Sequence, residues 1–323
     1  MGVRLMIPIK VDELKKQDIK KAMELWTRQY ELYCSGKPSY PLYWRDNTGS
    51  IERLLEGMCE AGCAFAARTE EGLAGYLAFW EAPFHGENTA YCPVFAHGVQ
   101  EENRESVYLA LYNHVSRLWV SKDIFNHMLT LFYNDKELIN LIFDLGFGSY
   151  VMDAFCLSSP SGGNCGVRRA LQADADAVYE LAEESRLYYK AAPIFLKRDV
   201  IEKEDIARLI NEGFVFIAEA DGEAAGFMNA SVAKEGYAVT LETEGTALID
   251  EIGAYIRPEH RGSGIGERLL MAIKDCCARE GIERIHVDFE TANPYANRFW
   301  RKHFDPVLLS VRRGVNRDVN AVD

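Results

Sequence analysis

A run of glycines separated by small and basic residues, Arg261-Gly262-Ser263-Gly264-Ile265-Gly266, is the segment of this sequence best suited to chemistry. It follows a predicted strand over residues 247–256 and opens a predicted amphipathic helix over residues 264–279. The first N–H groups of a helix have no internal partner, so they can hold an anion. Glycines let the backbone approach the anion's oxygens, and Arg261 can add a charge-assisted contact. The run therefore predicts a phosphate-binding turn, a pattern that Rossmann folds and ordinary tight turns share.

Predicted helices and strands alternate in both halves of the chain, in the same order. Hydrophobic periodicity defines them, together with hairpin signals at Glu71-Gly72 and Asp221-Gly222. In the second half the predicted elements cover residues 167–171, 174–182, 198–212, 214–220, 224–232, 247–256, 264–279, 284–289, 294–302 and 307–315. In the first half they cover residues 11–34, 64–67, 73–80, 90–96, 106–121, 127–133 and 136–144. The repeated order predicts a tandem duplication of one α/β unit.

Small and polar residues near the midpoint of the chain form its clearest linker. The stretch Ser158-Ser159-Pro160-Ser161-Gly162-Gly163-Asn164 is rich in serine and glycine and contains a proline. A chain of 323 residues also fits two domains of about 150 residues each. We therefore predict a first domain over residues 1–157, a linker over residues 158–165 and a second domain over residues 166–323.

The overall composition narrows the class of partner. Hydrophobic residues make up 48% of the chain and charged residues 26%, as in a soluble globular protein. The formal net charge of −13 disfavours nucleic acid, because a phosphate backbone attracts a basic surface. No apolar run is long enough to span a bilayer, and residues 1–10 lack the apolar segment of a secretory leader. We therefore expect a cytoplasmic protein with no nucleic-acid or membrane partner.

The cysteines and histidines predict no metal site. The eight cysteines include no Cys-x-x-Cys pair, and Cys59 and Cys63 have no matching histidine cluster. The histidines themselves lack the spacing of metal ligands. Reduced thiols in a cytoplasmic protein are the expected state of the cysteines.

Two motifs at the right separation identify the second half by resemblance. The first, Ile256-Arg-Pro-Glu-His-Arg-Gly-Ser-Gly-Ile-Gly266-Glu-Arg-Leu-Leu270, resembles the acetyl-CoA-binding motif of the GNAT N-acetyltransferase superfamily. The second, Asn293-Pro-Tyr-Ala296-Asn-Arg-Phe-Trp300, is similar to the family's Asn-x-x-Ala-x-x-Leu-Tyr segment. The order of elements agrees with the family over about residues 166–315. The resemblance implies two tandem GNAT-like α/β domains, each a mixed, mostly antiparallel twisted sheet flanked by helices.

The resemblance also implies acetyl-CoA as the cofactor and assigns residues to it. Backbone groups of Tyr255 and Ile256 would pair with the pantetheine arm like an added strand. Asn293 would lie beside the pantetheine. The pyrophosphate would be held by Arg261, Gly262, Ser263, Gly264, Ile265 and Gly266.

Proton transfer in the family suggests three catalytic candidates. An ammonium substrate must lose a proton before it attacks a thioester, and many members use an acidic residue on the strand before the loop. Asp250 and Glu251 stand there, although strand alternation turns only one of them to the substrate. The family's acid for the departing thiolate is a tyrosine, and Trp300 occupies its place; an indole N–H cannot serve as that acid. Tyr295 is the candidate that replaces it, with Tyr255 and His303 as further options.

Several of these residues also have ordinary structural explanations. Phe299 and Trp300 are more typical of core packing against the sheet than of ligand contact. The segment Tyr188-Tyr189-Lys190 suits either a substrate-binding loop or the end of an amphipathic helix. Asp250 and Glu251 are equally consistent with surface residues that flank a strand.

The first half keeps the architecture without the phosphate-binding turn. The corresponding stretch, residues 97–105, contains one glycine together with Glu101, Glu102 and Glu105, whose carboxylates would repel a pyrophosphate. The sequence therefore predicts a degenerate first domain that helps to shape the acceptor pocket of the second.

The favoured function is direct transfer of an acetyl group from acetyl-CoA to a primary amine in a ternary complex. The acceptor would be a small-molecule amine, and the protein a monomer or homodimer. An alternative is a non-catalytic acyl-CoA-binding sensor or scaffold, suggested by Trp300 and the degenerate half. A nicotinamide-binding Rossmann enzyme is the weakest alternative, because neither half has a glycine motif after its first strand.

Overall fold

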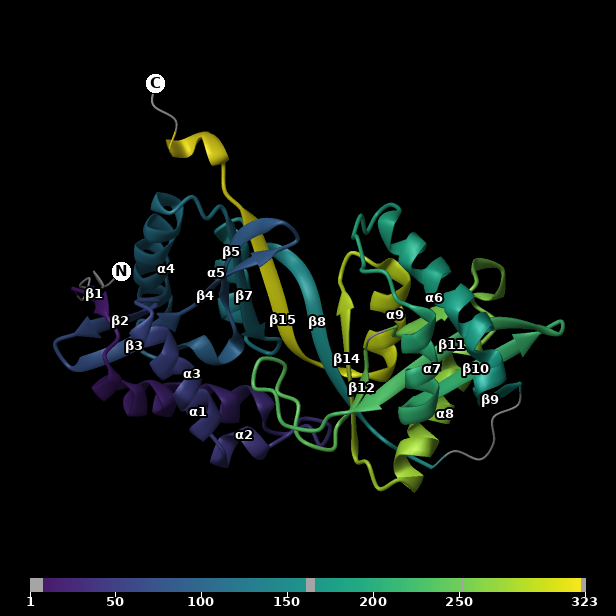
Figure 1. Ribbon diagram of the computed structural model, residues 1–323. Helices are drawn as coiled ribbons and strands as arrows, with labels where there is room; N and C mark the ends of the chain where they lie inside the picture. Colours follow the sequence, from purple (N-terminus) through teal and green to yellow (C-terminus); the bar gives the residue numbers. More distant parts are fainter. Residues whose placement is uncertain (1–7, 161–165, 251, 321–323) are drawn as a thin grey trace, which may run out of the picture.

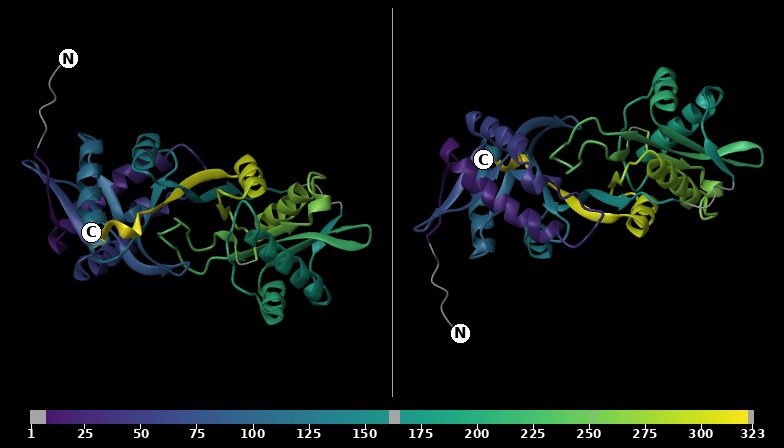
Figure 2. Two further views of the ribbon diagram at one scale, coloured as in Figure 1. Left: turned by 90° about the horizontal axis from the view of Figure 1, so that it is seen from above. Right: turned by 90° about the horizontal axis from the view of Figure 1, so that it is seen from below.

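The structure is a computed structural model that describes residues 8–160, 166–250 and 252–320. The two halves of the chain form two lobes side by side, joined through strands that cross the middle of the molecule (Figure 1). Views from above and below show the same elongated arrangement (Figure 2). Glu251, one of the two predicted bases, lies outside the described residues.

The first lobe follows the predicted order of elements, with some added strands. Its helices are α1 (Ile19–Cys34), α2 (Tyr43–Asp46), α3 (Gly49–Glu60), α4 (Arg104–Ser121) and α5 (Lys136–Asp144). Its strands are β1 (Lys10–Glu13), β2 (Ala64–Thr69), β3 (Gly72–Ala78), β4 (Trp80–Phe84), β5 (Glu87–Cys92), β6 (His97–Val99), β7 (Asn126–Phe132) and β8 (Gly148–Leu157). The strand predicted over residues 90–96 therefore ends early, and its last part is a 3₁₀ turn, η2 (Val94–Ala96).

The second lobe repeats this order. Its helices are α6 (Ala175–Lys190), α7 (Lys203–Glu212), α8 (Ile265–Arg279) and α9 (Pro294–His303). Its strands are β9 (Val167–Arg169), β10 (Phe214–Ala220), β11 (Glu223–Val232), β12 (Ala247–Ile249), β13 (Ala254–Ile256), β14 (Arg284–Glu290) and β15 (Asp305–Gly314). The single strand predicted over residues 247–256 is thus two strands, β12 and β13, separated by a bulge.

The first helices of the two lobes begin in the same way, which supports the predicted duplication. Helices α1 and α6 have 16 residues each, and each follows a short 3₁₀ turn that ends in an aspartate. Asp18 accepts a hydrogen bond from the backbone N–H of Lys15, and Asp174 accepts one from that of Leu171. These carboxylates satisfy N–H groups that a helix start leaves free.

The strands form a four-stranded sheet, β1-β2-β3-β6, and an 11-stranded sheet that runs through both lobes. The order in the larger sheet is β4-β5-β7-β15-β8-β14-β12-β11-β10-β9, and β13 pairs with β11. Most neighbours are antiparallel, while β5 with β7 and β12 with β14 are parallel. The predicted fold class, α/β with mixed and mostly antiparallel sheets flanked by helices, is confirmed.

The last strands of the two lobes change places. β8 ends the first lobe but pairs antiparallel with β14 of the second, and β15 ends the second lobe but pairs antiparallel with β7 of the first. β8 and β15 also pair with each other, and Figures 1 and 2 show both strands crossing between the lobes. The division of the chain at residues 158–165 stays a prediction, and the sheets do not separate along it.

A loop of the second lobe also reaches into the first. Residues 233–246, the green loop between β11 and β12 in Figure 1, extend toward α2. The indole N–H of Trp44 donates a hydrogen bond to the carbonyl of Leu241 at 3.0 Å. Ala238, Val239 and Leu241 are buried in the same apolar cluster as Trp44. The exchanged strands and this loop hold the two lobes as one packed unit.

Candidate functional site

The predicted phosphate-binding turn lies between β13 and α8 and has the backbone that its glycines allow. Gly262 and Gly264 adopt left-handed φ angles of +79° and +81°, and Gly264 is the residue before the first turn of α8. A Cβ at Gly266 would lie 3.1 Å from the ring of Phe299 and 3.2 Å from the side chain of Ile256. Gly262 and Gly264 therefore allow the left-handed backbone of the turn, and Gly266 allows close packing against Phe299 and Ile256.

Arg261 lies against this turn among aromatic rings. Its Nε donates to the carbonyl of Ile256 at 3.0 Å. Its guanidinium lies 4.7, 5.6 and 5.0 Å from the ring centroids of Tyr188, Tyr255 and Tyr295. Cation–π contacts of this kind hold an arginine in place while leaving its charge intact. A fixed positive charge therefore lies beside the start of α8, as a phosphate site requires.

The strand before the turn has an unpaired edge. β12 pairs with β14, whereas β13 pairs with β11 and with no other described strand. The N–H of Asn229 donates to Gly253, and the N–H of Arg257 donates to Ala225. Because backbone groups alternate along a strand, the N–H and C=O of Tyr255 face β11, and those of Ala254 and Ile256 face the open edge. The backbone contact predicted for Tyr255 does not fit this register, whereas the one predicted for Ile256 does.

Asp250 lies in the bulge between β12 and β13. Its side chain is half-buried, and one carboxylate oxygen accepts a hydrogen bond from the hydroxyl of Ser231 at 3.0 Å. Its backbone carbonyl accepts from the N–H of Gly253 at 2.7 Å, which closes the bulge. Of the two predicted bases, Asp250 is the one within the described residues, and it lies close to the unpaired edge of β13.

Asn293 is buried at the start of α9 and links that helix to α6. Its side-chain oxygen accepts from the N–H of Ala296 at 3.3 Å, which makes it the N-cap of α9. The same oxygen accepts from the hydroxyl of Tyr188, also at 3.3 Å. Asn293 thus joins the group of tyrosines around Arg261, as a residue beside a cofactor would.

Trp300 fills the core, as its alternative explanation predicted. It is 6% exposed and packs edge-on against Phe304 and Phe299. The predicted replacement, Tyr295, has an exposed side chain and lies on the first turn of α9. His303 lies 3.5 Å from Glu267, and burial lowers its pKa. Of these side chains, Tyr295 lies nearest to the Arg261 cluster and stays open to solvent.

The corresponding turn of the first lobe is occupied by its own side chains. Arg104 begins α4 and forms a two-pronged ion pair with Asp135, in which Nη1 lies 2.8 Å from Oδ1. Asp135 caps α5 as Asn293 caps α9. The predicted degeneracy of this lobe therefore extends from its sequence to its packing.

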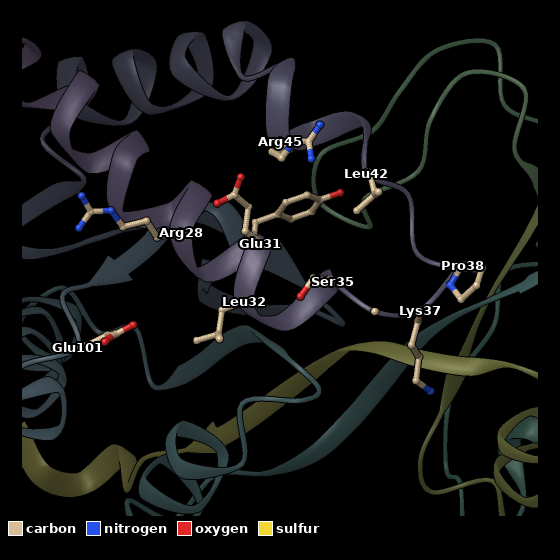
Figure 3. Close-up of a pocket in the computed structure, with 11 residues that line it drawn as sticks. Arg28, Glu31, Leu32, Ser35, Lys37, Pro38, Leu42, Arg45 and Glu101 are labelled. Atoms are coloured by element: carbon tan, nitrogen blue, oxygen red, sulfur yellow. The ribbon is translucent and has the colours of Figure 1, made fainter.

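A surface pocket of about 850 Å³ lies in the first lobe, away from the predicted site residues. Figure 3 shows that its walls come from α1, the segment between α1 and α2, and the β6–α4 turn. Its lining mixes acidic and basic side chains, among them Arg28, Glu31, Lys37, Arg45 and Glu101. It contains no group of the phosphate-binding turn.

Sequence reasoning missed a row of acidic side chains across the middle of the larger sheet. Alternate residues of β14 are buried in the apolar core, and His286, Asp288 and Glu290 lie on the opposite face. Asp153 of β8 is the direct ladder partner of Asp288. The polar alternation was visible in the sequence, but the pairing of β14 with a strand of the other lobe was not.

Two searches of the described residues found nothing. None of the helices that the structure describes is long and apolar enough to cross a membrane. Within the same residues, no group of three or more histidine, cysteine, aspartate or glutamate side chains could hold a metal ion.

Comparison with known proteins identifies the second lobe. Residues 175–305 match the family model described as the acetyltransferase (GNAT) family. This match covers the phosphate-binding turn, the split strand and α9. The second half of the chain therefore matches the GNAT acetyltransferase family over residues 175–305. No curated protein matches the chain significantly in sequence.

Solved structures extend the likeness of fold to the whole chain. A GCN5-related N-acetyltransferase from Sphaerobacter thermophilus aligns over 96% of this chain and 97% of its own, with 15% identity and a TM-score of 0.58. A GCN5-related glucosamine N-acetyltransferase region of a fungal multi-domain β-N-acetylglucosaminidase aligns over 97% of this chain and 39% of its own, with 10% identity and a TM-score of 0.53. A tandem GNAT protein from the clavulanic acid biosynthesis pathway aligns at 15% identity and a TM-score of 0.47, over 96% of this chain and 99% of its own. The first two structures share the fold of the whole chain.

Proposed function

We propose that this protein is an N-acetyltransferase that moves an acetyl group from acetyl-CoA to a primary amine by direct attack in a ternary complex. The observation that carries the proposal is the turn of residues 261–266, a glycine-shaped helix start beside an unpaired strand edge. Outward N–H groups and the charge of Arg261 suit a pyrophosphate. The open edge of β13 suits the amide groups of a pantetheine arm, which would add to the sheet as a strand does.

The residues around the bulge suit the proton transfers of this reaction. Acetyl-CoA would supply the acetyl thioester. Asp250, held by the hydroxyl of Ser231, is placed to accept the proton that an ammonium must lose before its nitrogen attacks. That nitrogen forms a bond to the acetyl carbon as the carbon–sulfur bond breaks, and the sulfur leaves as a thiolate. Its pKa, about 8.5 by analogy with cysteine, makes the thiolate a good leaving group, and the exposed phenol of Tyr295 is the candidate to protonate it.

Binding of acetyl-CoA by the full chain, measured by calorimetry, tests the cofactor site. A Gly262→Asp variant places a carboxylate in open space at the phosphate-binding turn, and we expect at least tenfold weaker binding from charge repulsion. Gly281→Asp is the matched control, because Gly281 has a similar left-handed φ of +73° and equally open surroundings at the far end of α8. The control carries the same backbone strain and should bind as the wild type does. The proposal fails if the wild type does not bind acetyl-CoA or if both variants bind it equally well.

A non-catalytic acyl-CoA sensor is the second candidate, because Trp300 stands where the family has its acidic tyrosine. Release of free thiol from acetyl-CoA across a panel of primary amines separates the two. Sustained release that falls in Asp250→Asn supports the enzyme. Tight binding of acetyl-CoA without release on any amine supports the sensor instead.

A further inference from the structure

The acidic row on the larger sheet crosses three neighbouring strands from both lobes. Asp153 of β8 lies directly opposite Asp288 of β14. On the other side of β14, Ile249 of β12 lies opposite Val287, and Asp250, the next residue along the chain, begins the bulge near Asp288. Neighbouring strands lie about 4.8 Å apart, so the row from Asp250 to Asp153 spans roughly 10 Å. The candidate base is therefore one end of a line of three carboxylates.

Part of this acidic charge is already balanced by protein groups. The imidazole of His286 lies 3.2 Å from Asp153 and 3.1 Å from Glu242. Burial alone would lower the pKa of His286, but the hydrogen bond to Asp153 and the charge of Glu242 raise it to about 9. His286 is therefore charged at neutral pH. Arg198, at 3.9 Å, faces Glu290.

Asp288 is the member of the row with no direct partner. It forms no hydrogen bond or ion pair with any residue in the described ranges, and its side chain is exposed on the face of the sheet opposite the apolar core. Desolvation, followed by the charge of Asp153, raises its pKa to about 6, while the nearby charges of His286 and Arg198 act to lower it. The exposed carboxylate is therefore open to a cationic partner.

A buried amide on the same face independently indicates a ligand. Asn229 of β11 is 1% exposed, and neither its side-chain nitrogen nor its side-chain oxygen has a hydrogen-bond partner among the described residues. Asn229 and Ser231 lie two residues apart on one strand and so face the same side, where Ser231 reaches Asp250. Leaving a buried amide unpaired costs free energy, so such a group marks a place for a partner that the chain itself does not supply.

We infer that this row is the acceptor site and that the acceptor is a linear diamine or polyamine. The inference rests on the proposed function, because the amine acetylated is the one at Asp250. A second ammonium of the acceptor then lies at Asp288, roughly 5 Å further along the row, and a third nitrogen has room toward Asp153. The reacting ammonium gives up one proton to Asp250 before attack and a second after the carbon–nitrogen bond forms. The carbon–sulfur bond breaks, the thiolate takes up a proton, and the products are the N-acetyl amine and free thiol. The second ammonium keeps its charge throughout.

Charge explains why such an acceptor is favoured over a monoamine. Each carboxylate in the row disfavours ionisation of the next, and a cation between them relieves that cost. A monoamine at Asp250 leaves Asp288 without a counter-ion, whereas a diamine of about four methylene groups neutralises both. An acceptor with a carboxylate in the second position would be repelled.

Matched acceptors test this with the full chain. 1,4-Diaminobutane, 4-amino-1-butanol and n-butylamine share one reactive amine and have a similar length, but only the first has a second cationic group. We expect kcat/KM for 1,4-diaminobutane to exceed both others at least tenfold, and spermidine to match or exceed it. If all three small amines are acetylated with similar kcat/KM, the inference is overturned and the proposed function stands. If none is acetylated although acetyl-CoA binds, the inference is overturned, and thiol release across the wider panel of primary amines decides the proposed function separately.

A substitution at Asp288 tests whether this residue causes the preference for a diamine over a monoamine. We expect Asp288→Asn to reduce the ratio of kcat/KM for 1,4-diaminobutane over n-butylamine at least fivefold, mainly through KM for the diamine. Asp221→Asn in the exposed β10–β11 turn is the control, since it removes the same charge at a left-handed position that asparagine tolerates. A ratio that stays at the wild-type value in Asp288→Asn contradicts the assignment. The acceptor comparison in the wild type needs no variant, so it decides the question even if Asp288→Asn misfolds.

Discussion

The two lobes share one fold but treat the same strand-to-helix turn in opposite ways. In the second lobe the turn has two left-handed glycines, and Arg261 lies beside it among tyrosines. In the first lobe the residue before α4 is Asn103, also left-handed, and Arg104 is drawn away to Asp135. The arginine that would face an anion in one lobe neutralises a buried carboxylate in the other.

The strand before the turn shows the same contrast. In the second lobe a bulge separates β12 from β13 and leaves an open strand edge. In the first lobe the corresponding strand, β6, also pairs with a single described strand, β3, but β6 and the preceding turn η2 are both buried. The indole of Trp26 donates to the carbonyl of Val94, and the hydroxyl of Tyr76 donates to the carbonyl of Phe95. A duplicated domain can therefore keep its fold while its own core fills the segment that stays open in the other copy.

The first lobe nevertheless contributes to the second. β8 supplies Asp153 to the acidic row, and Trp44 packs against the second-lobe loop of residues 233–246, which contains Glu242. These contacts follow from the exchanged strands. The degenerate lobe is therefore part of the wall of the acceptor site that we propose, and the contrast between the lobes can be tested at its charged groups.

The largest effect on stability is expected from the ion pair between Arg104 and Asp135, which lies in the first lobe where the second lobe has its predicted phosphate site. Arg104→Ala leaves Asp135 buried at 2% exposure without its counter-ion, and we expect a loss of about 3–5 kcal/mol in the free energy of unfolding. Arg168→Ala is the control: Arg168 pairs with Asp174 at the surface, where loss of an ion pair costs about 0–1 kcal/mol. Urea unfolding measures both.

The second lobe suggests how to rescue this variant. Asn293 caps α9 without any arginine partner, so Asp135→Asn in the Arg104→Ala background removes the buried charge and keeps the cap of α5. We expect the double variant to regain more than half of the lost stability. Equal stability of the single and double variants would show that the charge of Asp135 is not what Arg104 offsets.

A smaller effect is expected from pH, at the contact between the lobes. The pKa of His286 is about 9 in the folded chain and 6.5 in its unperturbed state, so its stabilisation is complete below about pH 6.5. It is lost as the pH rises through about 9, because the folded state then gives up its extra proton. We expect the stability to fall by roughly 2 kcal/mol between pH 6.5 and 9.5.

Thermal unfolding of the wild type and His286→Gln across this pH range isolates that contribution. The acidic groups facing His286 are Asp153, Glu242 and Asp288. The cysteine thiols also affect stability at high pH, but they do so equally in the wild type and in His286→Gln. Their contribution therefore cancels in the difference in stability between the two proteins. The variant should be less stable at pH 6.5 and should show a flatter curve. Parallel curves would mean that His286 does not carry the charge.

Local sequence patterns were enough to predict the glycine-rich turn between a strand and a helix, the repeated order of elements and the core role of Trp300. Each depends on residues close together in the chain. The strand exchange was not predictable, because the apolar alternation of β15 is the same whichever lobe it joins. The split of residues 247–256 was hidden for a similar reason, since one apolar run covers β12 and β13. Asp288 was missed because its row depends on Asp153, 135 residues earlier and across the exchanged strands.

The smallest effect on stability is expected at Arg261, the arginine beside the predicted cofactor site of the second lobe. Arg261→Ala removes a charge that lies among exposed or half-buried tyrosines rather than on a buried carboxylate, so we expect the unfolding free energy to change by about 1 kcal/mol or less. The affinity for acetyl-CoA should fall about tenfold, or about 1.4 kcal/mol, because one charge-assisted contact to the pyrophosphate is lost. The Arg104→Ala, Asp135→Asn double variant provides the opposite case and should bind acetyl-CoA as the wild type does. If the affinity falls for the double variant and not for Arg261→Ala, the lobes have been assigned the wrong way round.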